Sequence, residues 1–289
     1  MKNIFIFVWL LFIAVQVKAQ TEPAPPPAAP PPPVYGWTHG LVSAFTLNQV
    51  AFTDWAQGGV NTLSWNATAD GKSVDEMEIL RWFNGYRLGF GQARMGEQGT
   101  KKTDDKIELE SMLSYKTGGY IEPYVAATLK TQFAPGYTYD ADNVATQVSA
   151  FFDPAYLVQS AGLGYQPNKI IRTRFGLALR EVLTSQYAAY ADDPKTTTIE
   201  KSSVSGGLES VTNIDLPIDE NVMFTSQLEL FSAFKQMDEV IMRNTTSLAA
   251  KVGKYVIVVL NVQLINEKQI TPRTQVKQTL GIGVSYTVF

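Results

Sequence analysis

Polar and apolar residues alternate one by one along most of the chain after Trp37. In residues 107–115, for example, Leu109 and Leu113 fall on one face, while Glu108 and Glu110 fall on the other. A period of two residues is typical of β-strands with one apolar and one polar face. The pattern therefore predicts an all-β protein, with no convincing helix after Trp37.

The alternation divides this part of the chain into about twelve strands. The predicted strands are residues 37–51, 59–70, 77–93, 105–116, 119–132, 155–166, 170–183, 202–214, 220–234, 242–252, 254–266 and 275–289. They are roughly twice as long as strands of soluble sheets, and tilted membrane-spanning strands need about 9–11 residues. A closed barrel leaves no unpaired edge in lipid. The pattern therefore favours a single transmembrane up-and-down antiparallel β-barrel of outer-membrane type. The structural alternative is a soluble lectin-like sandwich.

The connections between the predicted strands fall into two alternating sets. One set, ADGKSVDE, KTGG, QPNK, NIDLPIDE and Gly253-Lys254, is mostly short, whereas the other is mostly longer and includes the stretch through APGYTYDADNVATQVSAFFDP. Bacterial outer-membrane barrels have short periplasmic turns and longer external loops. We therefore expect an outer-membrane location with both the N-terminus and the C-terminus in the periplasm.

The first 36 residues differ in composition from the rest. Lys2 precedes the apolar run IFIFVWLLFIAV, and Val17-Lys18-Ala19 then gives small or modest residues at the usual cleavage positions. This order predicts a cleaved signal peptide at residues 1–19, with an uncleaved anchor helix as the alternative. The proline-rich residues 20–36 predict an extended periplasmic spacer, with a docking motif as the alternative. The predicted barrel takes up residues 37–289.

Composition and charge exclude several classes of function. The formal net charge is −3 without a basic stripe, so no nucleic-acid partner is expected. Cysteine is absent, which excludes disulfides, thiolate metal sites and cysteine nucleophiles. Carboxylates gather in the predicted loops at Asp104-Asp105, at Asp140 with Asp142, and at Asp192-Asp193, without a calcium-loop spacing. We interpret them as solvated loop tips and expect neither a metal site nor a cofactor.

His39 is the single histidine of the chain and the only candidate catalytic base of its type. Barrel phospholipases and omptin-like proteases need a histidine, and they act at the outer leaflet or beyond. The predicted topology places His39 near the periplasmic rim instead. We therefore expect no catalytic residues, and a barrel hydrolase acting on lipid or peptide is the alternative function.

Charged residues recur on the faces that the barrel would turn inward. They are Arg81, Arg87, Glu108, Glu110, Glu122, Lys130, Arg172, Arg174, Arg180, Glu209 and Glu229. In a barrel of about twelve strands, opposite charges would meet across the lumen. They would form either a structural ion-pair network that fills a closed pore or a lining that selects a small hydrophilic solute. A third option, a lateral or lumenal site for a lipid-like ligand, needs an apolar interior, so the inward charges count against it.

The stretch TLNQVAFTDWAQGGVNTLSWNA carries a family resemblance. Its Gln49, Trp55, Gly58 and Gly59 resemble the N-terminal signature of the barrel family called domain of unknown function 3078 (DUF3078), with Asp54 where asparagine is common. The resemblance implies an outer-membrane barrel of diderm bacteria without an assigned activity. We interpret the stretch as the tip of the first hairpin, where glycines allow positive φ.

The terminal Phe289 is similar to the aromatic last residue of outer-membrane barrel assembly signals. The expected partners are therefore outer-membrane lipid, the barrel-assembly machinery during insertion, and an unidentified periplasmic or outer-membrane protein. The predicted function is non-enzymatic: either a structural or assembly component, or a narrow channel for small hydrophilic solutes.

Overall fold

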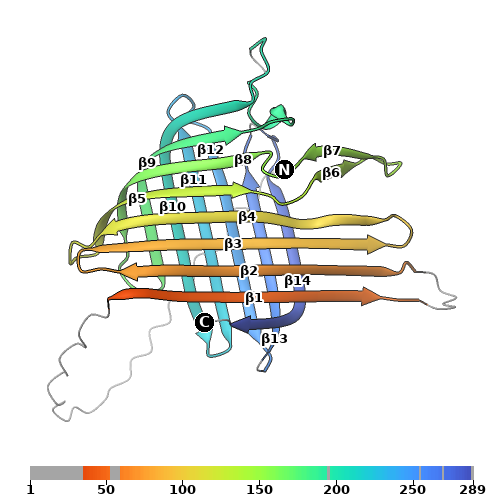
Figure 1. Cartoon of the computed structure of the whole chain (residues 1–289), viewed down its shortest axis with the longest axis horizontal. Coiled ribbons are helices and arrows are strands. Elements are labelled where there is room, and N and C mark those ends of the chain that lie inside the picture. The colour runs from red at the N-terminus through yellow and green to blue at the C-terminus, as the bar shows by residue number, and fades with distance from the viewer. Residues whose placement is uncertain (1–34, 53–58, 194–195, 254, 269, 288–289) are drawn as a thin grey trace, which may run out of the picture. The chain divides into compact units, whose positions relative to one another are not determined.

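The computed structural model describes residues 35–52, 59–193, 196–253, 255–268 and 270–287, with side chains up to residue 284 (Figure 1). The predicted signal peptide and nearly all of the predicted spacer lie outside the described residues. The same holds for Asp54, Trp55, Gly58 and Phe289. Within the described residues, no helix is long and apolar enough to cross a membrane.

Twelve long strands form one closed antiparallel barrel, and two short strands form a separate hairpin (Figure 1). The barrel strands are β1 (Gly36–Val50), β2 (Thr62–Glu76), β3 (Leu80–Met95), β4 (Thr100–Tyr115), β5 (Ile121–Thr131), β8 (Ala155–Tyr165), β9 (Ile171–Leu183), β10 (Ser202–Asp219), β11 (Val222–Ala233), β12 (Val240–Lys251), β13 (Val256–Asn266) and β14 (Gln275–Thr287). Each strand pairs with the next one along the barrel, and β1 pairs with β14 to close it. The predicted up-and-down barrel is confirmed.

Most predicted strands agree with the observed ones to within a few residues, but two predicted connections are wrong. The segment ADGKSVDE lies inside β2, and nearly all of NIDLPIDE lies inside β10. The reason is that the neighbouring strands are also long. Asp75, for example, pairs with Trp37 on β1 and with Trp82 on β3, so the ladder continues through polar residues.

The connections at the two ends of the barrel differ in length. One end, called the short-turn end here, carries residues 77–79, 116–120, 166–170, 220–221 and 252–255. The other end, the loop end, carries residues 51–61, 96–99, 132–154, 184–201, 234–239 and 267–274. β1 begins and β14 ends at the short-turn end. The start of the first barrel strand and the end of the last one therefore lie on the same side of the barrel.

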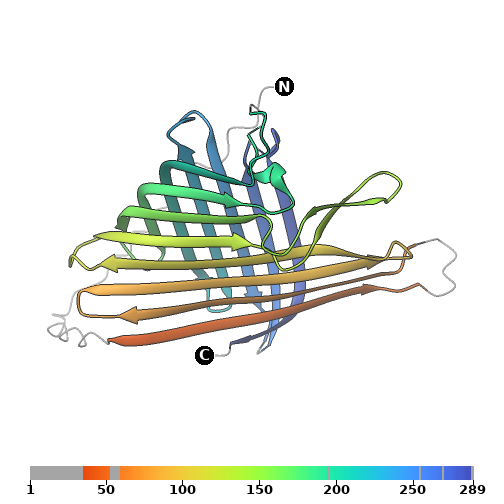
Figure 2. The same ribbon diagram turned by 45° about the horizontal axis from the view of Figure 1, so that its top comes forward.

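The loop between β5 and β8 contains the hairpin of β6 (Gly136–Tyr139) and β7 (Ala145–Ser149). The hairpin extends away from the barrel at the loop end, as Figures 1 and 2 both show. At its tip, the Asp140 carboxylate accepts hydrogen bonds from the backbone N–H groups of Asp142 and Val144. This carboxylate therefore stabilises the turn of the hairpin.

Outward-facing positions of the barrel strands are apolar and exposed. Along β9, Phe175 and Leu177 are 57% and 62% exposed, while the alternate residues Arg174 and Arg180 are buried. On β14, Val276 and Leu280 are similarly exposed. An apolar exterior around an interior of charged residues is the reverse of a soluble protein and is typical of a barrel that spans an outer membrane.

Candidate functional site

Four groups of ion pairs lie in the lumen, and together we call them the lumen belt. Its members are the basic residues Arg87, Lys130, Arg174, Arg180 and Arg243 and the acidic residues Glu108, Glu110, Glu209, Glu229 and Glu267. The two signs are balanced, five against five, and every member is paired. Such a set fixes side chains inside the lumen without leaving an excess of either charge.

Arg174 on β9 pairs with two acidic residues of the belt. Its side chain is 8% exposed and pairs with Glu110 on β4 and, at 3.7 Å, with Glu209 on β10. The guanidinium also lies 5.7 Å from the ring centroid of Tyr124 on β5. Because β4 and β9 are not neighbours in the barrel, the Arg174–Glu110 pair joins separate parts of the wall.

Two further contacts cross the lumen to β11. Lys130 on β5 forms an ion pair with Glu229, and Arg87 on β3 donates a hydrogen bond to the side chain of Gln227. Arg87 also pairs with Glu108 on β4 at 3.1 Å. Since β3 and β5 lie across the barrel from β11, these contacts occupy the middle of the lumen.

Towards the loop end, Glu267 holds two arginines together. Its carboxylate pairs with Arg180 at 2.5 Å and with Arg243 at 2.9 Å, and its side chain is only 2% exposed. Both guanidinium groups face the ring of Tyr156, at 5.3 Å and 5.1 Å. The sequence pattern did not identify Glu267, because it directly follows β13 and falls in a predicted loop.

Towards the short-turn end, a second group of ion pairs lines the wall. Arg81 bridges Glu76 at 2.6 Å and Glu122 at 3.2 Å, and Arg172 pairs with Asp215 at 2.9 Å. The structure thus brings all eleven predicted lumen charges into ion pairs. The additional partners are Glu76, Lys116, Asp215, Arg243 and Glu267.

Cavities of different size lie along the lumen. A cavity of about 610 Å³ is lined by residues of the short turns, including Tyr120 and Lys169, and we call it the short-turn cavity. A cavity of about 290 Å³ lies at the loop end, lined by Lys102 and Lys277 among others. Only about 60 Å³ is open within the belt. Little of the space between the belt side chains is therefore open.

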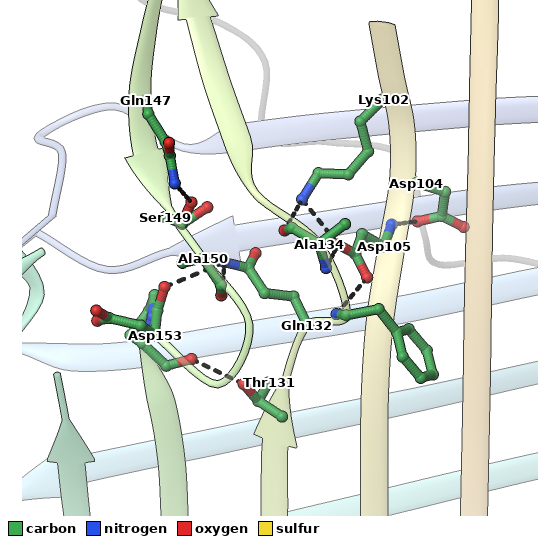
Figure 3. A network of polar contacts seen from close by, with 12 residues as sticks. Lys102, Asp104, Asp105, Thr131, Gln132, Ala134, Gln147, Ser149, Ala150 and Asp153 are labelled. Carbon is green, nitrogen blue, oxygen red and sulfur yellow. Dashed lines mark hydrogen bonds and ion pairs between the residues drawn. The ribbon is translucent and has the colours of Figure 1, made fainter. Parts of the chain in front are cut away.

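The β5–β8 loop (residues 132–154) is fixed at the loop end by the carboxylate of Asp105 (Figure 3). Asp105 accepts hydrogen bonds from the backbone N–H groups of Phe133 and Ala134 at 2.7 and 2.9 Å and pairs with Lys102 at 2.7 Å. Its side chain is 2% exposed, and Asp104 pairs with Lys277 at 2.5 Å. The interpretation of Asp104-Asp105 as a solvated loop tip is therefore wrong, because β4 begins at Thr100 and includes both residues.

Asp153 connects this loop to the β9–β10 loop (residues 184–201). Its Oδ2 atom accepts hydrogen bonds from the backbone N–H groups of Gln186 and Tyr187 at 2.7 and 3.4 Å. Burial, together with the charge of Asp153, raises the pKa of Tyr190 in the same loop. In contrast, hydrogen bonds from the Thr196 hydroxyl and the Asp193 backbone N–H lower the pKa of Glu200.

His39 lies on the outer face of β1 near the short-turn end, stacked on Trp37 with 5.7 Å between ring centroids. Its Nδ1 lies 2.8 Å from the hydroxyl of Ser73, which lies 2.6 Å from the hydroxyl of Tyr86. A serine beside a histidine is the arrangement of a nucleophile with its base. However, Ser73 lies inside the β1–β2–β3 ladders, where the strand backbone is already paired. These ladders do not provide the N–H donors of an oxyanion hole.

No group of three or more potential metal-ligating residues gathers anywhere in the described part of the chain. The described residues of the first-hairpin signature are Gln49, which is near the end of β1, and Gly59. Gly59 has a φ of 152°, as expected for a glycine next to a turn.

The apolar exterior and the charged interior define an outer-membrane-type β-barrel. The family described as "Protein of unknown function (DUF3078)" matches residues 47–137, which confirms the resemblance expected from the first hairpin. No curated protein matches the chain.

Solved structures are similar to this chain, among them three with 12% sequence identity. The translocator domain of autotransporter NalP from Neisseria meningitidis has a TM-score of 0.38, with 88% of each chain covered. An outer membrane channel from Pseudomonas putida F1 has a TM-score of 0.40, with 90% of this chain and 98% of that chain covered. The beta domain of a Bordetella autotransporter has a TM-score of 0.34, with 87% and 99% covered.

Proposed function

We propose that this protein is a non-enzymatic outer-membrane barrel with a resting lumen closed by the belt, and that it serves as a structural or assembly component. The lumen belt is the observation that carries the proposal. Its contacts join β3, β4 and β5 to β9 and β11 on other parts of the wall. A lining that selects ions by charge carries rings of one sign, whereas the belt is balanced.

The proposed orientation has the short-turn end in the periplasm and the loop end outside. The support is the asymmetry of the connections, since bacterial outer-membrane barrels have short periplasmic turns. Both the N-terminus and the C-terminus are then periplasmic. In this position the protein would contact outer-membrane lipid, the barrel-assembly machinery during insertion and an unidentified periplasmic or outer-membrane protein.

Planar-bilayer recording of the purified protein tests the closed lumen. We expect the unmodified barrel to be silent and the triple variant Lys130→Ala, Arg174→Ala, Glu229→Ala to conduct, because the side chains that cross the middle of the lumen are removed. The matched control is Arg172→Ala with Asp215→Ala, an ion pair outside the belt, which should stay silent. Steady conductance of the unmodified protein would overturn the proposal.

A narrow channel for small hydrophilic solutes is the second candidate. It is favoured by the cavities of about 610 and 290 Å³ on the two sides of the belt. If the belt rearranges to let solutes pass, the unmodified protein will conduct, and neutralising Arg174 or Glu229 will change its ion selectivity. The same recordings therefore decide between the two functions.

A further inference from the structure

We propose that the short-turn cavity binds a small, hydrophilic, soluble ligand with two separated phosphate groups, such as a phosphorylated sugar. The cavity has a volume of about 610 Å³ and is lined by strands β2, β3, β4, β5, β8, β9 and β10 as well as by two short turns. This volume is within the range of roughly 300–1,000 Å³ that small-molecule sites occupy.

The charges of the short-turn cavity are not balanced. Its basic residues are Lys72, Arg81, Arg87, Lys169, Arg172 and Arg174, and its acidic residues are Glu76, Glu110, Glu122 and Asp215. All four carboxylates have basic partners: Arg81 and Lys116 for Glu76, Arg174 for Glu110, Arg81 for Glu122, and Arg172 for Asp215. The excess of six basic over four acidic residues favours an anionic ligand.

Lys72 and Lys169 supply the positive charge that the wall leaves uncompensated. Neither ammonium group makes an ion pair with any residue in the described ranges, and both residues are exposed. Lys72 lies on β2, whereas Lys169 lies in the turn between β8 and β9, so β3, β4 and β5 intervene along the wall. Two ammonium groups on separate parts of the wall match two separated negative groups on one ligand.

The remaining polar groups of the cavity fit hydroxyls. The side-chain amides of Gln166 and Asn213 line it and make no hydrogen bond within the part of the chain that the structure describes. Phe83 offers a ring face, over which the guanidinium of Arg172 lies at 6.0 Å, and Tyr120 at the rim is 66% exposed. The side-chain amides and the rings, together with the cations, suit a phosphorylated sugar better than a purely inorganic anion.

We expect a ligand to enter from the short-turn end, because residues of the short turns, including Tyr120 and Lys169, line the cavity and only about 60 Å³ is open between the belt side chains. The site goes beyond the proposed function and does not depend on whether the belt conducts. A silent barrel and a conducting barrel can both hold a ligand here. Bilayer recordings can therefore contradict the closed lumen without contradicting the binding site, and binding measurements can contradict the site without contradicting the closed lumen.

Isothermal titration calorimetry with the full chain in non-ionic detergent at low salt tests the site, with glucose 1,6-bisphosphate as the probe. We expect the bisphosphate to bind and glucose not to bind. Lys72→Gln combined with Lys169→Gln should weaken binding by at least about tenfold, because each charge-assisted hydrogen bond is worth about that factor. Binding should also weaken as salt is raised.

Lys235→Gln is the matched control, since Lys235 is an exposed lysine in the β11–β12 connection at the loop end. It should leave the affinity unchanged. Lys169→Gln alone changes only an exposed turn residue, so it keeps the test valid if the double variant does not fold. The proposed site would be overturned if glucose bound as tightly as the bisphosphate. It would also be overturned if Lys169→Gln left the affinity for the bisphosphate unchanged.

A last comparison separates a soluble ligand from a lipid head group, because both can carry phosphate. Dihexanoyl phosphatidic acid presents a phosphate on a short-chain lipid. We expect it to bind more weakly than the bisphosphate, since it offers one phosphate and no hydroxylated ring. If this lipid binds more tightly than the bisphosphate, and if Lys169→Gln weakens its binding, the cavity is a site for a lipid head group. That result would overturn the proposal of a soluble ligand.

Discussion

Lys130 on β5 and Glu229 on β11 form an ion pair across the lumen, although their strands are not neighbours in the barrel. Their side chains are 17% and 24% exposed, so the pair is largely withdrawn from water. Such a pair is stable only when both charges are compensated, because a lone charge in a buried position has a large desolvation cost. The pair therefore couples two walls of the barrel.

A double-mutant cycle on this pair should show strong coupling. We expect Lys130→Ala and Glu229→Ala each to lower the free energy of unfolding, and the double variant to lose much less than their sum. The coupling energy should be about 1 kcal/mol or more, as for residues in one ion-pair network. Urea unfolding of the refolded protein in detergent micelles measures it.

The control is the same cycle on Arg172 and Asp215, whose side chains are 38% and 40% exposed. Exposed ion pairs contribute less, at about 0.2–1 kcal/mol. Additive losses for Lys130 and Glu229 would show that the two walls are not coupled through this contact.

Neutralising Glu267 should be among the most destabilising single changes in the lumen. Glu267→Gln leaves Arg180 and Arg243 beside each other without their shared carboxylate. Removing one partner from a buried ion pair costs about 3 kcal/mol or more. Glu220→Gln, in the exposed turn between β10 and β11, is the control and should change the stability by less than about 0.5 kcal/mol. An equally small loss for Glu267→Gln would mean that water compensates the two arginines.

The strands and their inward faces could be predicted from the sequence because a period of two fixes which side chains share a face. The inward direction of Arg174, Glu110 and the other nine predicted lumen charges follows directly from that rule. The partner of each charge could not be predicted in the same way. Lys130 meets Glu229 only because of the closure and stagger of the barrel, which a pattern along one strand does not contain.

Two features were missed for different physical reasons. Glu267 follows the end of β13, so no alternation marks it as inward-facing, and only its position directly after a strand hints at a lumen role. The β6–β7 hairpin is short, and the alternation in GYTY and ATQVS was included in a long predicted loop. The available signal was the pair of turn-forming residue types Asp140 and Asn143 between the two segments. In the structure, Asn143 has a φ of 62°.

Gly162 on β8 should not tolerate a larger side chain. It pairs with Gly176 on β9, and a Cβ atom at residue 162 would lie 2.2 Å from the backbone oxygen of Phe175. Gly162→Ala must therefore push the two strands apart, with an expected loss of about 2 kcal/mol. Gly164→Ala is the control on the same strand, where the nearest atom would be 3.4 Å away. Heat-modifiable gel migration and urea unfolding measure both variants, and equal stability would show that the ladder adjusts freely.

The β9–β10 loop should lose order in acid through Glu200. The folded-state pKa of this carboxyl lies below its ordinary value of 4.5, first because the Thr196 hydroxyl donates to it and then because the Asp193 backbone N–H does. A lowered folded-state pKa means that the contribution to loop order is fully present above pH 4.5. The contribution is lost as the pH falls through the lower folded-state value.

Hydrogen exchange, corrected for the intrinsic pH dependence of the exchange rate, checks this expectation. Amides of residues 184–201 should lose protection between pH 6 and pH 3, whereas the turn at residues 116–120 serves as an internal reference. Glu200→Gln should show the low protection at both pH values, because the uncharged amide is a weaker acceptor for the two donors. Protection that falls with pH equally in Glu200→Gln would assign the change to another group, such as Asp192, which accepts a hydrogen bond from the Glu200 backbone N–H at 3.0 Å.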